Sequence, residues 1–206
     1  KVICIIQARM NSTRLPGKVL RKISNKPMLW YILNSLQYSK TLDHIVVATT
    51  KKKIDDQIVE LCKKMKVSVF RGNENNVLNR FCEAGKKYHA THVVRISADC
   101  PFIDPVIVDK IVRKSLTSNV DYVSNTLPKT YPMGYEVEVI KLPALLKAEK
   151  MTNDFGDQEH ELEGLELLAS YIALAEIISK ERGEKNTHLT RYYINKIIDS
   201  VPPTID

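Results

Sequence analysis

The sequence predicts an α/β fold with three layers, in which helices cover both faces of a mostly parallel sheet. Short apolar segments rich in β-branched residues alternate with longer segments whose apolar residues recur at helical spacing. The chain has 206 residues, of which 44% are hydrophobic, so it can bury a substantial core as one domain. We therefore expect a single domain over residues 1–206, with a less clearly defined helical segment from about residue 150 to 206.

The first strand is expected at Val2–Ile6, because this run is too short for a helix and is apolar throughout, as in strands buried on both faces. Later strands are expected at His44–Thr49, Val67–Phe70, His92–Ile96, Tyr122–Ser124 and Tyr135–Ile140.

The first helix is expected to begin near Pro27, which suits a first helical turn. Apolar residues then recur on one face at Met28, Ile32, Leu33 and Leu36. Further helices are expected at Asp55–Met65, Asn76–Tyr88 and Pro105–Leu116, the last with Asp104 as its N-cap. The apolar run Leu162–Ile178 also predicts a helix, which could pack on the domain or form a homodimer contact.

A basic loop follows the first strand and carries Arg9, Arg14 and Lys18. Ligands bind at the carboxyl edge of open parallel sheets, where turn amides can line an anion site. Arginine adds a planar fork of donors, and lysine adds a mobile charge. The loop therefore predicts a polyanion site, with a triphosphate as the favoured ligand. The alternative is an exposed basic turn at Pro16–Gly17.

Two common phosphate-binding motifs do not fit this loop. A P-loop needs glycine five positions before its Gly-Lys pair, where this chain has Ser12, and a Ser or Thr after the lysine, where it has Val19. The dinucleotide motif needs three closely spaced glycines, and the loop contains only Gly17. Its positive charge therefore comes from side chains, while small residues allow the backbone to approach a ligand.

Carboxylates are expected at the same sheet edge. Asp99 follows the strand His92–Ile96 and could hold Mg²⁺, which favours one or two carboxylates together with phosphate oxygens; the alternative is a turn-forming Asp. Glu136 and Glu138 are two residues apart and so share one strand face, where like charges repel unless a cation lies between them. We favour Glu138 as the second metal ligand, and a solvated strand face is the alternative.

Five segments together resemble the SpsF-type cytidylyltransferases of spore-coat polysaccharide biosynthesis, which are related to the CMP-ketodeoxyoctonate and CMP-sialate synthetases. The segments are Gln7–Leu20, Ile45–Thr50, Val69–Gly72 with Asn76–Phe81, Val93–Asp104 and Tyr131–Val139. This resemblance implies a Rossmann-like nucleotide-diphosphosugar transferase fold. It also implies Mg²⁺-dependent transfer of CMP from CTP to a sugar acid or related small anionic acceptor, with release of pyrophosphate, in polysaccharide or surface-glycan synthesis.

The resemblance implies roles for particular residues. Arg9, Arg14 and Lys18 would act on the phosphates. The nucleotide-binding residues would be Ala8, Arg9, Asn11, Ser12, Thr13, Lys18, Arg71, Ser97 and Ala98. Asp99 and Glu138 would hold the metal, and Glu136 and His188 would lie near the acceptor. For Arg71 and for Arg80 the alternative is a surface cation or a salt bridge. For His188 the alternatives are a structural histidine or a match of the same family element to Asp157–His160 instead.

The amino-acid composition limits the classes of partner that we expect this protein to bind. The net charge of +7 comes from dispersed lysines without interleaved aromatic residues, which favours a solvated surface over a nucleic-acid site. No segment reaches the roughly 18 apolar residues of a membrane span, and no signal-peptide core is evident, so a cytoplasmic location is expected. The four cysteines lack zinc-ligand spacing.

Two other functions remain possible from the sequence. A glycosyltransferase of similar fold would usually carry an Asp-x-Asp metal motif, which Asp99-Cys100-Pro101 does not provide. A non-catalytic nucleotide-binding protein would retain the basic loop and bind CTP, yet would release no pyrophosphate.

Overall fold

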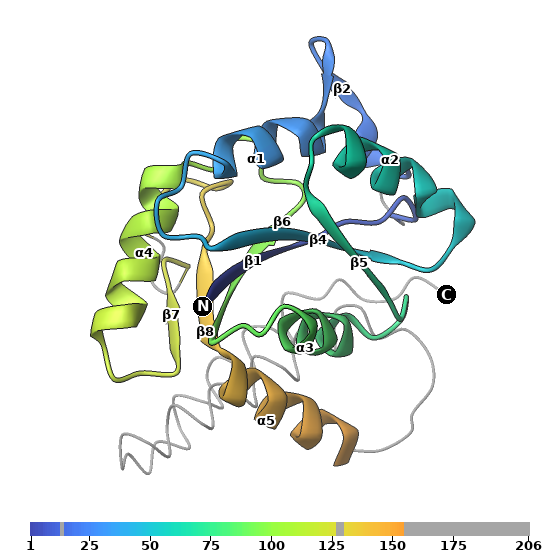
Figure 1. The fold of residues 1–206 in the computed structure, drawn as a ribbon. Coiled ribbons are helices and arrows are strands. Elements are labelled where there is room, and N and C mark those ends of the chain that lie inside the picture. Colours follow the sequence, from blue (N-terminus) through green and yellow to red (C-terminus); the bar gives the residue numbers. More distant parts are fainter. Residues whose placement is uncertain (13–14, 127–129, 155–206) are drawn as a thin grey trace, which may run out of the picture.

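The protein is described here by a computed structural model that covers residues 1–12, 15–126 and 130–154 (Figure 1). Its main sheet has six strands in the order β5-β4-β1-β6-β8-β7. Their bounds are β1 Val2–Gln7, β4 His44–Thr50, β5 Ser68–Gly72, β6 His92–Ser97, β7 Tyr122–Ser124 and β8 Glu138–Lys141. Strands β5, β4, β1 and β6 run parallel, whereas β8 is antiparallel to both of its neighbours. The predicted α/β fold with a mostly parallel sheet is confirmed.

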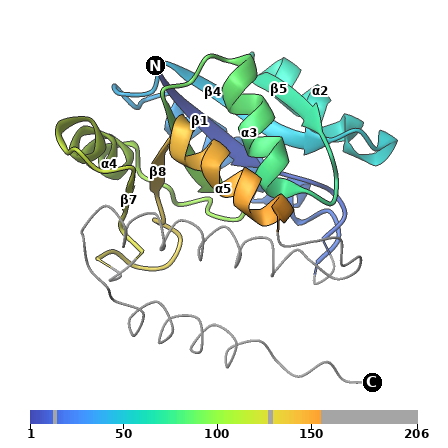
Figure 2. The same ribbon diagram turned by 90° about the horizontal axis from the view of Figure 1, so that it is seen from below.

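Helices cover both faces of this sheet, as Figures 1 and 2 show. Their bounds are α1 Met28–Leu36, α2 Asp56–Lys64, α3 Val77–Lys87, α4 Pro105–Thr117 and α5 Leu142–Asp154. Alternate residues of the central strand β1 divide between two apolar clusters: Cys4 and Ile6 pack with α1, α2 and α4, and Ile3 and Ile5 pack with α3 and α5. Strand β1 is thus buried on both faces, as its apolar sequence predicts.

The order of the strands creates a switch point beside β1. From β1 the chain passes through α1, β4 and α2 to the edge strand β5, and α3 then returns it to β6 on the other side of β1. After β1 the chain therefore continues to β4 on one side of the β1–β6 pair, and after β6 it continues to β7 and β8 on the other side. In open α/β sheets, ligands bind at the carboxyl ends of the strands at such a point.

Several elements differ from the sequence predictions. The short strands β2 (Lys22–Ile23) and β3 (Lys26–Pro27) form an unexpected hairpin before α1, and α5 was also not expected. Strand β8 begins at Glu138 rather than at Tyr135, because Val137 exchanges hydrogen bonds with the backbone and side chain of Asn125 instead of extending the ladder.

The predicted cap of α4 is confirmed, since the Asp104 side chain accepts a hydrogen bond of 2.7 Å from the backbone N–H of Val106. In the part of the chain that the structure describes, no helix has the length and apolar character needed to cross a membrane. The predicted helix Leu162–Ile178, with its suggested dimer contact, lies outside the described residues.

Candidate active site

A salt bridge joins the two loops that diverge at the switch point. Lys18 begins the 3-10 helix η1 (Lys18–Leu20), and Asp99 lies two residues beyond β6. The Lys18 Nζ is 2.6 Å from the Asp99 Oδ2. The Lys18 side chain is 25% exposed and that of Asp99 is 40% exposed, so a ligand can reach both. Two predicted site residues that are 81 positions apart in the sequence therefore come together.

Asp99 is held in its charged form. Burial alone would raise the pKa of its carboxyl group, but hydrogen bonds from Lys18 and Ser97 outweigh burial and lower that pKa. The Ser97 hydroxyl donates to Oδ1, while Lys18 binds Oδ2. Asp99 is therefore a carboxylate at neutral pH, the state that a metal ligand requires.

Glu136 lies beside Asp99. Its Oε2 accepts a hydrogen bond of 2.7 Å from the Gly134 backbone N–H. The Cys100 Sγ lies 3.7 Å from this oxygen and 4.0 Å from the Asp99 Oδ1, so both carboxylates approach one thiol. Burial, followed by the charges of Asp99 and Glu136, raises the pKa of Cys100 to about 12. Cys100 is thus a neutral thiol rather than a nucleophile at physiological pH.

Glu138, the favoured second metal ligand, has a different environment. Its Oε2 lies 2.6 Å from the Arg95 Nη1, and only 6% of its side chain is exposed. Arg95 is the residue opposite Glu138 in the β6–β8 ladder. The cation beside Glu138 is thus an arginine of the protein, whereas Glu136 lies before β8 and contacts Gly134 and Cys100. Sequence reasoning missed the Arg95–Glu138 pair, although the alternation along β6 puts Arg95 and Ser97 on one face.

The basic loop itself is closed by backbone hydrogen bonds. The Met10 carbonyl accepts from the backbone N–H of Ser12 at 3.0 Å and of Gly17 at 2.8 Å. Gly17 has φ of 69°, and a Cβ there would lie 3.3 Å from the Met10 Cε, so both backbone and space favour glycine. The loop is therefore folded back on Met10. Lys18 is the next residue after Gly17, at the point where the loop closes.

The other predicted residues of this loop differ in their surroundings. Asn11 is exposed, and Arg9 and Ser12 are half-buried. The N–H groups of Ala8 and Ser12, which we expected to face phosphate, bond to the carbonyls of Ala48 (3.1 Å) and Met10. Ala98 is buried. Three predicted site residues lie outside the described residues, namely Thr13, Arg14 and His188.

Arg71 lies at the end of the edge strand β5, and its guanidinium binds the segment after β4. It donates to the carbonyls of Thr50 (2.8 Å) and Lys52 (2.7 Å), and its Nη1 is 2.6 Å from the Asp56 Oδ1. These contacts favour the structural alternative considered for Arg71 over direct contact with a nucleotide.

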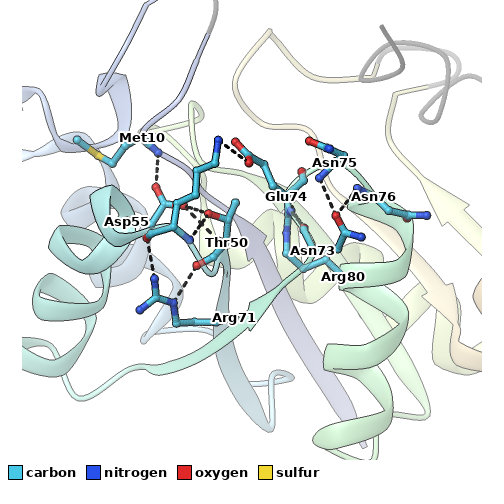
Figure 3. Close-up of polar contacts among 10 residues, drawn as sticks. Met10, Thr50, Asp55, Arg71, Asn73, Glu74, Asn75, Asn76 and Arg80 are labelled. Atoms are coloured by element: carbon cyan, nitrogen blue, oxygen red, sulfur yellow. Dashed lines mark hydrogen bonds and ion pairs between the residues drawn. The ribbon is translucent and has the colours of Figure 1, made fainter. Parts of the chain in front are cut away.

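Arg80 is fully buried rather than a surface cation. Its Nη1 donates to the carbonyls of Asn73 and Glu74, so it fixes the loop that follows β5 (Figure 3). A Cβ on Gly72 would lie 3.0 Å from the Arg80 Cγ and 2.9 Å from the Phe70 Cε1, so Gly72 makes room for this side chain.

Sequence reasoning also missed Asp55, which ends the 3-10 helix η2 (Lys53–Asp55) and is 1% exposed. Its carboxylate accepts from the Met10 backbone N–H at 2.8 Å and from both the N–H and the hydroxyl of Thr50 (Figure 3). We had assigned Asp55 to the start of the following helix. Its spacing from the basic loop gives no local signal of this contact.

A basic loop and a carboxylate thus meet at the switch point of an open α/β sheet, which is where proteins of this class bind their ligands. This chain belongs to the cytidylyltransferase family, whose model matches residues 3–162. The SpsF-type resemblance is confirmed: the chain is 35% identical over 149 residues to the spore coat polysaccharide biosynthesis protein SpsF of Bacillus subtilis, covering 70% of this chain and 61% of that protein.

Other relatives support the same family and fold. Uncharacterized protein MJ1063 of Methanocaldococcus jannaschii is 45% identical over 160 residues, covering 78% of this chain and 65% of that protein. A solved cytidylyltransferase structure from Leptospira borgpetersenii superposes with a TM-score of 0.75 and 34% identity, covering 84% of this chain and 71% of that one. The chain thus spans somewhat less than two thirds of these two curated relatives.

Proposed function

We propose that this chain transfers CMP from CTP to an acceptor and releases pyrophosphate. The observation that carries the proposal is the Lys18–Asp99 salt bridge at the switch point of a cytidylyltransferase-family domain. Relatives named 3-deoxy-manno-octulosonate cytidylyltransferase, including one from Zea mays that is 38% identical over 116 residues, support a sugar acid or a related small anion as acceptor.

In this reaction an acceptor oxygen attacks the α-phosphorus of CTP, and the bond from that phosphorus to the bridging oxygen of pyrophosphate breaks. Lys18 and Arg9 would neutralise charge on the phosphates and on the departing pyrophosphate. Arg14 stays a predicted partner in this role. Fixed charges of this kind lower the barrier because they stabilise the transition state without reorganising. The protein's further contribution is to align the acceptor with the leaving group.

Asp99 and Glu136 form the donor set that best fits a divalent cation. Their oxygens approach the same Cys100 thiol, and hard carboxylate ligands suit Mg²⁺. We therefore assign the second ligand to Glu136 in place of Glu138, because Glu138 is both paired with Arg95 and buried, with 6% of its side chain exposed, whereas the Asp99 side chain is 40% exposed. When bound, the cation would supply positive charge to the phosphate oxygens. Among the described residues, no group of three or more His, Cys, Asp or Glu side chains forms a metal cluster. Mg²⁺ typically binds one or two carboxylates together with phosphate oxygens and water.

A pyrophosphate-release assay tests the proposed function. The protein is incubated with Mg²⁺, each of the four nucleoside triphosphates in turn, and a panel of sugar acids, phosphorylated sugars and phosphonates. We expect release with CTP and at least one acceptor, together with a CMP-linked product detected by mass spectrometry. Release with ATP or UTP but not with CTP would contradict the cytidylyl assignment. CTP binding without release across the panel would favour the non-catalytic alternative.

Two glutamine substitutions separate the roles of the glutamates. Glu136→Gln should raise the Mg²⁺ concentration for half-maximal activity about tenfold or more, with little change in stability, because it removes a charged metal ligand. Glu138→Gln should instead lower the free energy of unfolding by about 3 kcal/mol, because it leaves the Arg95 charge without its buried partner carboxylate. Chemical denaturation and Mg²⁺ titration measure both effects. The reverse pattern would return the metal to Glu138.

A further inference from the structure

We propose that Asp55 is a positioning residue for the basic loop, and that through Met10 and Gly17 it fixes where Lys18 meets the triphosphate. This inference deepens the proposed function and rests on it. Asp55 lies in the segment after β4, and the loop it holds follows the neighbouring strand β1. It would not touch CTP itself, so its influence would pass entirely through the backbone of the loop.

The Asp55 carboxylate holds the basic loop through its hydrogen bonds. Oδ1 accepts from the Met10 N–H at 2.8 Å, and Oδ2 accepts from the Thr50 N–H at 3.3 Å and from the Thr50 hydroxyl. Asp55 is 1% exposed; its hydrogen bonds to Thr50 are buried and the one to Met10 is partly buried. Hydrogen bonds to a carboxylate are the stronger kind. Asp55 thus ties the basic loop to the end of β4, as Figure 3 shows.

The backbone of Met10 links Asp55 to the closure of the loop. Its N–H, in the Arg9–Met10 peptide, is held by Asp55, and its carbonyl, in the Met10–Asn11 peptide, accepts from Ser12 and Gly17. The two peptide groups on either side of one Cα therefore anchor the loop and close it. Lys18 follows Gly17 directly and reaches Asp99. A change in the backbone angles of Met10 would therefore move the point from which the Lys18 side chain extends.

The segment that carries Asp55 is itself held in place. Arg71 donates to the Thr50 and Lys52 carbonyls, and the Lys52 ammonium lies 2.7 Å from the Glu74 Oε2 (Figure 3). These contacts attach residues 50–56 to β5 and to the loop after it. Asp55 is therefore a fixed acceptor that can determine the position of the basic loop.

The test substitution is Asp55→Asn, which keeps the shape of the side chain. An asparagine has one carbonyl oxygen and one NH₂ group, so it cannot accept from Met10 and from Thr50 on separate atoms. Asp109→Asn is the matched control. Asp109 is also a buried carboxylate, and it accepts from the backbone N–H groups of Lys40 and Thr41 and from two hydroxyls. It holds the turn before β4, at the opposite edge of the sheet from the site.

Kinetics provide the functional measurement. We expect Asp55→Asn to raise the KM for CTP about tenfold or more, with a smaller change in the KM for the acceptor, because sub-ångström displacement of charged groups is costly. Asp109→Asn should lower the melting temperature to a similar degree but leave the KM for CTP unchanged. In a double variant with Lys18→Ala, the effect of Asp55→Asn should largely disappear, since residues that act as one unit are not additive.

The Met10 amide provides a measurement that does not depend on activity. The chain has five methionines, so a ¹⁵N-methionine spectrum is simple, and Met10→Leu identifies the Met10 signal. In Asp55→Asn that signal should shift and exchange with solvent about tenfold faster or more, while the other methionine signals stay in place. Asp109→Asn should leave the Met10 signal unchanged.

The outcomes separate the inference from the proposed function. If the wild-type protein releases no pyrophosphate from CTP, the proposed function fails, and the Met10 amide still reports whether Asp55 holds the loop. If Asp55→Asn frees Met10 but leaves the KM for CTP within about twofold of wild type, the positioning role is wrong. Should Asp55→Asn not fold, Thr50→Val removes the hydroxyl that holds the other carboxylate oxygen of Asp55. Faster exchange of the Met10 amide in that variant with an unchanged KM for CTP would also overturn the inference.

Discussion

Replacing Lys18 with alanine is expected to lower kcat about 10²- to 10³-fold, equivalent to about 3–4 kcal/mol of transition-state stabilisation, the scale measured for a single oxyanion contact. The Lys18 ammonium lies at the switch point beside the Asp99 carboxylate, and in the proposed function the phosphate charge would develop there. Lys18→Ala should also raise the KM for CTP, because the lysine charge attracts the triphosphate in the ground state.

Lys18→Arg is the more demanding variant, because it keeps the positive charge but replaces a compact ammonium with a planar fork. We expect it to restore much of the CTP affinity and only part of kcat. Lys22→Ala is a suitable control, since Lys22 is an exposed cation on β2 in the same segment of the chain. Steady-state kinetics with circular dichroism as the folding check measure these effects. Near-normal turnover in folded Lys18→Ala would remove Lys18 from the site.

The sheet and the Lys18–Asp99 part of the candidate site could be predicted from the sequence, because both depend on local patterns. Apolar β-branched runs defined the parallel strands, and the residues that follow β1 and β6 had to share the carboxyl edge. The meeting of Lys18 with Asp99 follows from that topology. The short hairpin β2–β3 escaped prediction because two-residue strands leave no periodic pattern.

The contact partners of the carboxylates were harder to predict than the positions of their residues in the fold. Two neighbouring glutamates led us to expect a metal cation between them, and the cation that the structure places beside Glu138 is Arg95. Asp55 shows the same difficulty, because a carboxylate at a helix start normally indicates a cap. Here it binds Met10, 45 positions away. Contacts of this kind are determined by packing between strands, so one sequence carries little local signal for them.

Replacing Asp99 with asparagine should separate catalysis from nucleotide binding. We expect kcat to fall about 10²-fold or more, as for loss of other charged groups that act in the transition state. CTP affinity measured without metal should stay within a few fold of wild type or improve, because the negative charge of Asp99 repels phosphate and its removal frees Lys18. Lys18→Ala should weaken CTP binding under the same conditions, so calorimetry distinguishes the two variants.

The pH dependence of stability provides a second, independent test of the Asp99→Asn variant. The pKa of Asp99 is lowered in the folded protein, since hydrogen bonds from Lys18 and Ser97 outweigh the effect of burial. The ionised group therefore stabilises the fold above its unfolded pKa, and this contribution is lost as the pH falls through the folded pKa. Part of the acid destabilisation of the wild type should be absent in Asp99→Asn and reduced in Lys18→Ala. Denaturation at pH 7 and at pH 3 measures it, and an unchanged acid dependence in both variants would mean that the salt bridge is not formed in solution.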